Sequence, residues 1–101
     1  MTLTEACMSA MEGNFISHKH FDSKQSMHSY KGDLYYEDGA NLTLGSGFDY
    51  LNHEEWAKED WYVKFSAEKV DKEKLKELHE KYGNIMLQGD KSYEECIIKS
   101  S

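Results

Sequence analysis

Apolar and small side chains recur at helical spacing at the start of the chain. They are Leu3, Ala6, Cys7, Ala10 and Met11. Thr2 and Glu5 have the spacing of a capping box, in which each side chain binds the other residue's backbone N–H, and Gly13 is a typical helix stop. The pattern predicts a helix over residues 3–12.

A period of two, typical of strands, follows over residues 14–21. Phe15, Ser17, Lys19 and Phe21 fall on one face, and Ile16, His18 and His20 on the other. After a polar turn at 22–25, short segments at 27–30, 34–37 and 41–44 are separated by Lys31-Gly32 and Asp38-Gly39. Dipeptides that end in glycine favour tight hairpins, so these segments predict an antiparallel meander. Gly45-Ser46-Gly47 is expected to be a connector.

The second half of the chain adds helices and a further strand. Asn52 and Glu55 repeat the capping-box spacing, which predicts a short helix through Ala57. In the strand 61–65, Trp61, Val63 and Phe65 share one side, and we expect this strand at the centre of the sheet. From Asp71 the period is helical, with Gly83 as the stop. The apolar face of this helix carries Leu75, Leu78, His79 and Tyr82.

The tail is less distinct. Residues 85–87 fit a short strand, whereas 92–99 fit either a capped helical turn or a strand, and we favour a strand closing a hairpin around Gly89-Asp90. These elements predict one α+β domain over residues 1–101: an N-terminal helix, an antiparallel meander sheet, a short helix before a central strand, a C-terminal helix and a short hairpin. The expected core is Leu3, Cys7, Phe15, Leu34, Trp61, Val63, Leu75 and Leu78.

Charge narrows the range of functions. The chain has 19 acidic residues against 12 lysines, contains no arginine and has a formal net charge of -7. Nucleic-acid binders carry a basic stripe and favour arginine, so we expect no nucleic-acid partner. No apolar run is long enough to span a membrane, and no basic segment followed by a hydrophobic stretch marks the N-terminus. We therefore expect a cytoplasmic protein.

Motifs for catalysis or metal binding are weak. His18 and His20 share a strand face and His28 falls on the next strand, a geometry that would allow a three-histidine site, but half-exposed strand histidines are the more frequent outcome. Cys7 and Cys96 have no CxxC spacing, which leaves a single disulfide between them as an alternative, but Cys7 falls on the apolar face of a predicted helix and is expected to be a buried thiol. No nucleophile motif or phosphate-binding glycine motif is present. We expect a binding module, not an enzyme, with no cofactor and no metal.

Several short motifs carry a family resemblance over residues 2–64. They are Thr4-Glu5-Ala6, Met11-Glu12-Gly13, Lys19-His20-Phe21 before a polar turn and the strand 27–30, the hairpin segment 34–39, and 55–63 with its Ala-Lys-Glu-Asp-Trp run. Together they resemble small phage proteins of the Thoeris anti-defence 2 type. The chain departs from that family in lacking its central segment with Pro and Trp and in having Phe21 at its early Trp, and residues 66–101 have no counterpart.

The resemblance implies a phage protein that forms homo-oligomers and sequesters a cyclic ADP-ribose-type immune signal without cleaving it. The residues it suggests for ligand binding are Lys19, His20, Phe21, Tyr30, Tyr35, Tyr36 and Trp61. We expect the base near Phe21 and the phosphates near Lys19 or His20, although a Trp before an alternating strand is more often core than ligand platform. The alternative is an acidic inhibitor that binds a host defence protein, like a DNA mimic or an anti-CRISPR protein.

Overall fold

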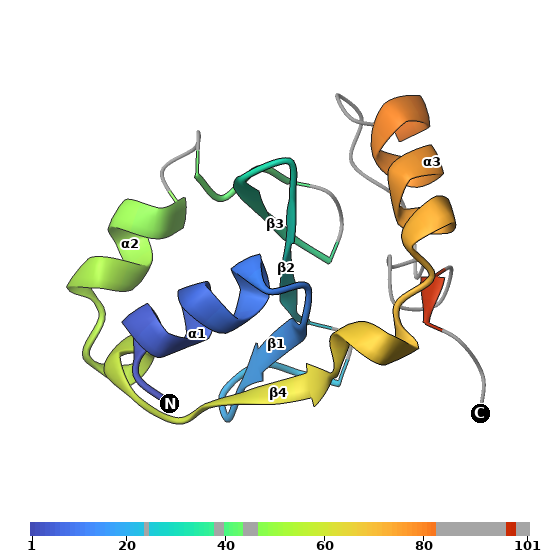
Figure 1. Cartoon of the computed structure of the whole chain (residues 1–101). Helices are drawn as coiled ribbons and strands as arrows, with labels where there is room; N and C mark the ends of the chain where they lie inside the picture. Colours follow the sequence, from blue (N-terminus) through green and yellow to red (C-terminus); the bar gives the residue numbers. More distant parts are fainter. Residues whose placement is uncertain (24, 38–39, 44–46, 83–96, 99–101) are drawn as a thin grey trace.

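The computed structural model describes residues 1–23, 25–37, 40–43, 47–82 and 97–98 (Figure 1). The elements in chain order are α1 (Leu3–Met11), β1 (Phe15–His18), β2 (Met27–Tyr30), β3 (Asp33–Tyr36), α2 (Gly47–His53), the 3-10 helix η1 (Glu55–Lys58), β4 (Trp61–Phe65), the 3-10 helix η2 (Ala67–Lys69) and α3 (Lys72–Tyr82). The fold class is α+β, as the sequence predicts.

The described strands form one antiparallel sheet in the order β3-β2-β1-β4. The β2–β3 hairpin has the two-residue turn that the sequence predicts. Both turn residues have positive φ, 50° at Lys31 and 86° at Gly32, which is the type I′ conformation that matches the twist of the flanking strands.

The expectation that residues 61–65 form the central strand is wrong. β4 pairs with β1 alone among the described strands and therefore lies at the sheet edge. On its outer side the backbone of Met1 runs beside it, where Met1 N donates to Trp61 O at 2.9 Å and Trp61 N donates to Met1 O at 3.2 Å. Val63, expected in the core, is 44% exposed because nothing in the described chain covers that part of the edge.

Helix α1 covers one face of the sheet and contacts all four strands (Figure 1). Its capping box is formed as predicted: Glu5 N donates to Thr2 Oγ1 at 3.1 Å, and Thr2 N donates to Glu5 Oε1 at 2.8 Å. Gly13 follows the helix with φ of 106°, a conformation that favours glycine. The cap and the glycine therefore set both ends of α1 locally.

Side chains alternate between the two faces of the sheet. In β2, Met27 joins the core under α1 and the Ser29 hydroxyl donates to Ala10 O at 2.7 Å, whereas the ring of His28 packs against His79 of α3. The sheet therefore has α1 on one face and α3 on the other.

Two apolar clusters result instead of the single core that we expected. The larger one lies under α1 and contains Leu3, Ala6, Ala10, Ile16, Met27, Leu34, Leu42, Leu51, Ala57 and Trp61. The smaller one, on the opposite face, contains Phe15, Val70 and Ile97, with Leu75 and Leu78 of α3 partly buried against it. Cys7 is a half-buried free thiol whose pKa is raised by burial.

Two short segments differ from the sequence prediction. Residues 41–43 form no strand: Asn41 makes an isolated bridge to Tyr35, and Leu42 N donates to Leu34 O at 2.7 Å. The helix predicted to begin at Asn52 is not formed as expected, because Asn52 lies inside α2. The 3-10 helix η1 begins after Glu54, and no side chain caps it. Helix α2 itself was not expected.

The predicted strand 85–87 and the hairpin around 89–90 lie outside the described residues. Of the segment 92–99, the structure describes Ile97, which is buried, and Ile98, which bridges to Val70. No helix in the described ranges combines the length and the apolar character needed to cross a membrane.

Candidate ligand-binding pocket

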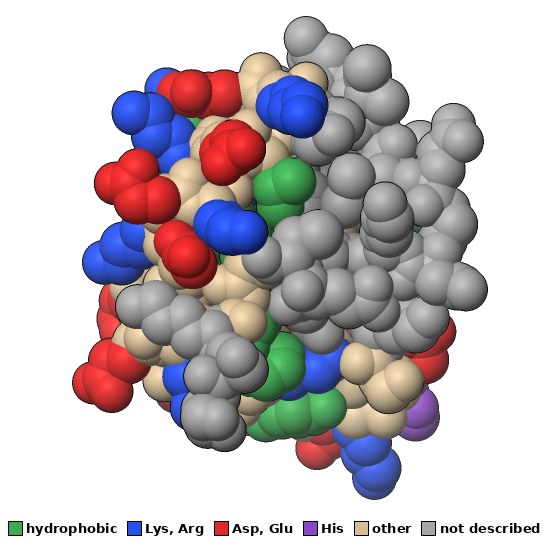
Figure 2. Space-filling view, turned by 90° about the vertical axis from the view of Figure 1, so that its right-hand side faces the viewer, with side chains coloured by type: hydrophobic (Ala, Val, Ile, Leu, Met, Phe, Trp, Pro, Cys, Tyr) green, Lys and Arg blue, Asp and Glu red, His purple; other side chains and the backbone are tan. Residues whose placement is uncertain are grey.

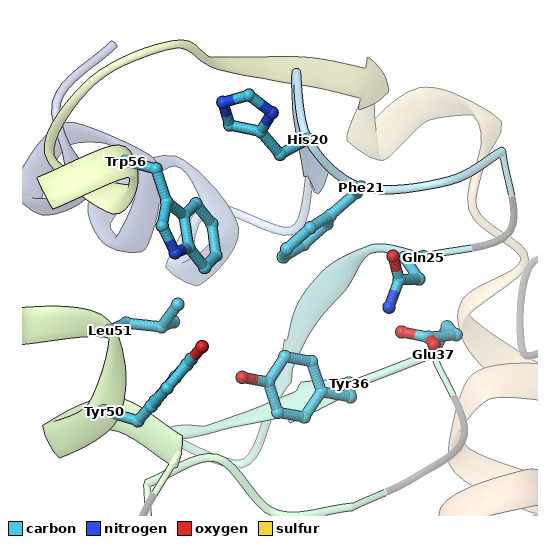
Figure 3. A pocket seen from close by; sticks show the side chains of 8 residues that line it. All are labelled: His20, Phe21, Gln25, Tyr36, Glu37, Tyr50, Leu51 and Trp56. Atoms are coloured by element: carbon cyan, nitrogen blue, oxygen red, sulfur yellow. The ribbon is translucent and has the colours of Figure 1, made fainter. Parts of the chain in front are cut away.

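A pocket of about 630 Å³ opens beside the larger apolar cluster, where four separate segments of the chain meet (Figure 3). Its lining residues come from the loop between β1 and β2, the end of β3, α2 and η1. They are His20, Phe21, Gln25, Tyr36, Glu37, Tyr50, Leu51 and Trp56. Five of these eight have aromatic rings, and their polar atoms lie at the ring edges or in the Gln25 and Glu37 side chains.

His18 sets the course of the loop that carries His20 and Phe21. Its Nδ1 accepts a hydrogen bond from the backbone N–H of His20 at 2.9 Å, and its Nε2 lies 2.6 Å from Glu59 O. Because a backbone N–H can only donate, Nδ1 carries no proton, so Nε2 carries it and donates to the Glu59 carbonyl. The buried ring therefore ties the end of β1 to the chain after η1, next to the pocket.

A second turn places Gln25 and leads into β2. Asp22 and Gln25 bind each other reciprocally: Gln25 N donates to Asp22 Oδ1 at 3.1 Å, and Asp22 N donates to Gln25 Oε1 at 2.9 Å. The Gln25 side chain is therefore held by its oxygen, and Figure 3 shows its amide nitrogen on the side of Glu37.

Glu37 is the carboxylate among the described residues that line the pocket. It is half-buried, and its Oε2 accepts a hydrogen bond at 3.2 Å from the backbone N–H of Ser26, a fully buried residue. This bond fixes the orientation of the carboxylate in the pocket.

The rings of the pocket meet at steep angles. Trp56 lies 6.2 Å from Phe21 with 64° between the ring planes, and 6.5 Å from Tyr50 with 60°. His20 meets Trp56 at 6.1 Å and 89°. In Figure 3 the rings of Trp56, Tyr50, Tyr36 and Phe21 stand around a common open space, so they form the walls of a cage and not two parallel plates.

The structure brings three of the seven predicted ligand residues into this pocket: His20, Phe21 and Tyr36. Lys19 is exposed and is not among the described residues that line the pocket. Trp61 lies behind the pocket as core: it is 2% exposed, its ring packs at 5.3 Å against Phe21, and its Nε1–H donates to Ala57 O at 2.7 Å.

Tyr30 and Tyr35 lie on the opposite face of the sheet, away from the pocket. Both pack on His79 of α3, with ring centroids 4.3 Å and 4.4 Å away. Their separation from Tyr36 follows from the alternation of side chains along strands, because neighbours in a strand point to opposite faces.

The histidines are not arranged as a metal site. His18 and His28, expected to be half-exposed, are both buried, and they lie on opposite faces of the sheet. His28 Nε2 lies 2.9 Å from His79 Nε2, and burial lowers the pKa of both rings, that of His79 to about 4. The described residues contain no group of three or more His, Cys, Asp or Glu side chains that would hold a metal.

Sequence reasoning missed five lining residues. They are Gln25, Glu37, Tyr50, Leu51 and Trp56. The signal for Trp56 was present, because a Trp next to a charged helix start is a large ring without an obvious core position. Tyr50 and Leu51 belong to α2, and the chain around them has neither helical period nor cap signal that would have marked a helix there.

Fold and pocket together define a small α+β protein with an aromatic-lined pocket at the edge of its main core. Comparison of the chain with protein-family models, with curated proteins and with solved structures finds no match. Its function must therefore be argued from the pocket and from the residue pattern.

Proposed function

We propose that this protein is a non-catalytic binding module that sequesters a nucleotide-type signal, with the base of the ligand held in the aromatic pocket. The observation that carries the proposal is the cage of rings around about 630 Å³, a volume typical of small-molecule sites. A base offers a flat π face to one ring and hydrogen-bonding edges to polar groups such as Gln25 and Glu37.

Sequestration without cleavage agrees with the chemistry of the walls. The eight described lining residues include no Ser, Thr, Cys or Lys nucleophile, and the side chains among them of a type that serves as a general base are His20 and Glu37. The resemblance to the Thoeris anti-defence 2 type supplies the rest of the proposal: a phage protein acting in the host cytoplasm on a cyclic ADP-ribose-type signal.

The test is calorimetry with cyclic ADP-ribose isomers and cyclic dinucleotides, followed by heating to release the ligand and chromatography to show that it is intact. Tyr50→Ala is the informative variant because Tyr50 is 55% exposed and contacts Trp56 without entering the core. Loss of one stacking ring should weaken binding by roughly 5- to 150-fold. Tyr62→Ala, which removes a similarly exposed Tyr outside the pocket, should bind like the parent.

Heat from none of these ligands, or recovery of a cleaved product, would overturn the proposal. Equal weakening by Tyr50→Ala and Tyr62→Ala would show that the ligand binds elsewhere.

A second candidate, an acidic inhibitor of a host defence protein, is favoured by one feature. Residues 54–60 contain Glu54, Glu55, Glu59 and Asp60, of which the last three are exposed. Lys58 lies among them and pairs with Glu55 at 3.0 Å. By contrast, the face shown in Figure 2 mixes lysines with acidic side chains where it is described, so a basic partner would bind at η1 and not there. Capture of a host protein that is lost on reversing the charge of Glu59 and Asp60 would support this candidate.

A further inference from the structure

Gln25, which lines the pocket, is held at three of its four polar groups. Its backbone N–H donates to Asp22 Oδ1 at 3.1 Å, and its backbone carbonyl accepts from the hydroxyl of the buried Ser17 at 2.9 Å. Its side-chain oxygen accepts from the backbone N–H of Asp22 at 2.9 Å. The fourth group is the side-chain nitrogen. Gln25 is therefore positioned before a ligand arrives, and binding costs it little further freedom.

The contact with Asp22 also decides which end of the Gln25 amide faces the pocket. The two ends of a glutamine amide have nearly the same shape, and only their hydrogen-bond partners tell them apart. A backbone N–H can only donate, so the end next to Asp22 N is the oxygen. The nitrogen is the other end, and Figure 3 shows it turned toward Tyr36 and Glu37. This part of the pocket wall therefore presents N–H donors.

A donor at the wall restricts how a base lies in the pocket. The nitrogen of a primary amide carries two N–H groups and accepts no hydrogen bond. In adenine the ring nitrogens accept, whereas the exocyclic amino group donates. An amino group opposite Gln25 would set N–H groups against each other, so the favourable orientation is the one in which a ring nitrogen faces Gln25.

We propose that Gln25 is a specificity-determining residue that donates a hydrogen bond to a ring nitrogen of an adenine base held by the aromatic walls. The inference rests on the proposed function in taking the ligand to be an adenine nucleotide, and it adds how the base is oriented and which residue contacts its edge. Gln25 is exposed, so this bond forms at the rim of the pocket in competition with water, and its contribution is that of one neutral hydrogen bond.

The test removes the ring nitrogens of adenine one at a time. 1-Deazaadenosine, 3-deazaadenosine and 7-deazaadenosine each replace one nitrogen by C–H, and they control for one another because each keeps the fused rings and the amino group. By titration calorimetry, one of the three should bind roughly 3- to 10-fold more weakly than adenosine, and the other two within about twofold of it. This comparison uses the parent protein, so it does not depend on the folding of a variant.

Gln25→Glu then identifies the donor. A glutamate keeps an oxygen for the Asp22 N–H but has no N–H of its own, so the preference for adenosine over the sensitive analogue should disappear or reverse. Asn52→Asp makes the same change from amide to carboxylate at an exposed position of α2 that is not among the described residues lining the pocket. This control variant should keep the preference.

The outcomes separate this inference from the proposed function. Equal affinity of the three analogues, or no binding of adenosine while cyclic ADP-ribose isomers still bind, would overturn the inference and leave the proposed function standing. An unchanged preference in Gln25→Glu would overturn the role of Gln25. Binding of no nucleoside and no nucleotide would overturn the proposed function, and the inference with it.

Discussion

The contact between His28 and His79 predicts that the protein loses stability in mild acid. Their Nε2 atoms are 2.9 Å apart, so one nitrogen donates and the other accepts. The rings of Tyr30, Tyr35 and Phe15 surround the two histidines, and both histidines are buried. A proton added to the accepting nitrogen would set two N–H groups against each other in a site that disfavours charge.

The magnitude follows from the pKa of His79, which burial lowers from an ordinary value of 6.5 to about 4. Above pH 6.5 the ring is neutral in both the folded and the unfolded chain, so this contribution to stability is complete. As the pH falls below 6.5 the unfolded chain takes up a proton that the folded protein does not. Stability is then lost until about pH 4, by about 2 kcal/mol at pH 5 and about 3 kcal/mol in total. The pKa of His28 is also lowered, through burial and the neighbouring His79, which acts in the same direction.

The assay is urea unfolding at a series of pH values from 7 to 4. Carboxylates titrate in part of this range, so the informative quantity is the difference between the parent and His79→Gln, whose amide still forms hydrogen bonds but takes up no proton. The parent should lose about 2 kcal/mol more than His79→Gln between pH 7 and pH 5. His53→Gln, which removes an exposed histidine of α2, should lose as much as the parent. Parallel curves for the parent and His79→Gln would refute the burial of a neutral His79.

Two further predictions concern the core and the assembly. Trp61→Ala should lower the free energy of unfolding by ~3 to 5 kcal/mol, because it removes a buried ring and its hydrogen bond to Ala57 O. A urea midpoint equal to that of the parent would contradict the assignment of Trp61 to the core. The protein should form a homo-oligomer, because the family resemblance implies one and because β4 lies at the sheet edge with Tyr62 and Val63 exposed. Light scattering that gives a monomer at micromolar concentration would contradict this prediction.

Elements with local signals were predictable from the sequence. Helix α1 has its cap and its terminal glycine within the segment, and the β2–β3 hairpin has a turn in which Gly32 adopts positive φ. Helix α3 has an apolar face with helical period, and Leu75, Leu78 and His79 do face the protein interior. In each case the deciding interactions join residues a few positions apart.

Features that depend on distant contacts were not predictable in the same way. The alternation in residues 61–65 fits a central or an edge strand equally well, and the decision comes from pairing with β1 some 45 residues earlier. Helix α2 has a polar, aperiodic sequence, and what anchors it is Leu51, buried in the main core. No spacing rule links His28 to His79, 51 positions apart. Of the residues that line the pocket, the sequence indicated His20, Phe21 and Tyr36. It did not indicate Tyr50 or Trp56, because they reach the pocket through tertiary contacts that no local pattern reveals.

The aromatic residues on the two faces of the sheet are packed differently. On the α3 face, Tyr30, Tyr35 and the two histidines close on one another, so these rings are held together by packing. On the α1 face, Trp61 and His18 pack against the core side of the Phe21 ring just as closely. On the pocket side of Phe21, the aromatic rings stand apart around an open volume. A rigid inner layer that carries an open outer one is the arrangement that binding needs, because the walls are positioned before the ligand arrives and lose little freedom when it binds. The proposed ligand-binding role therefore belongs to the α1 face, and the buried histidine pair contributes to the stability of the fold.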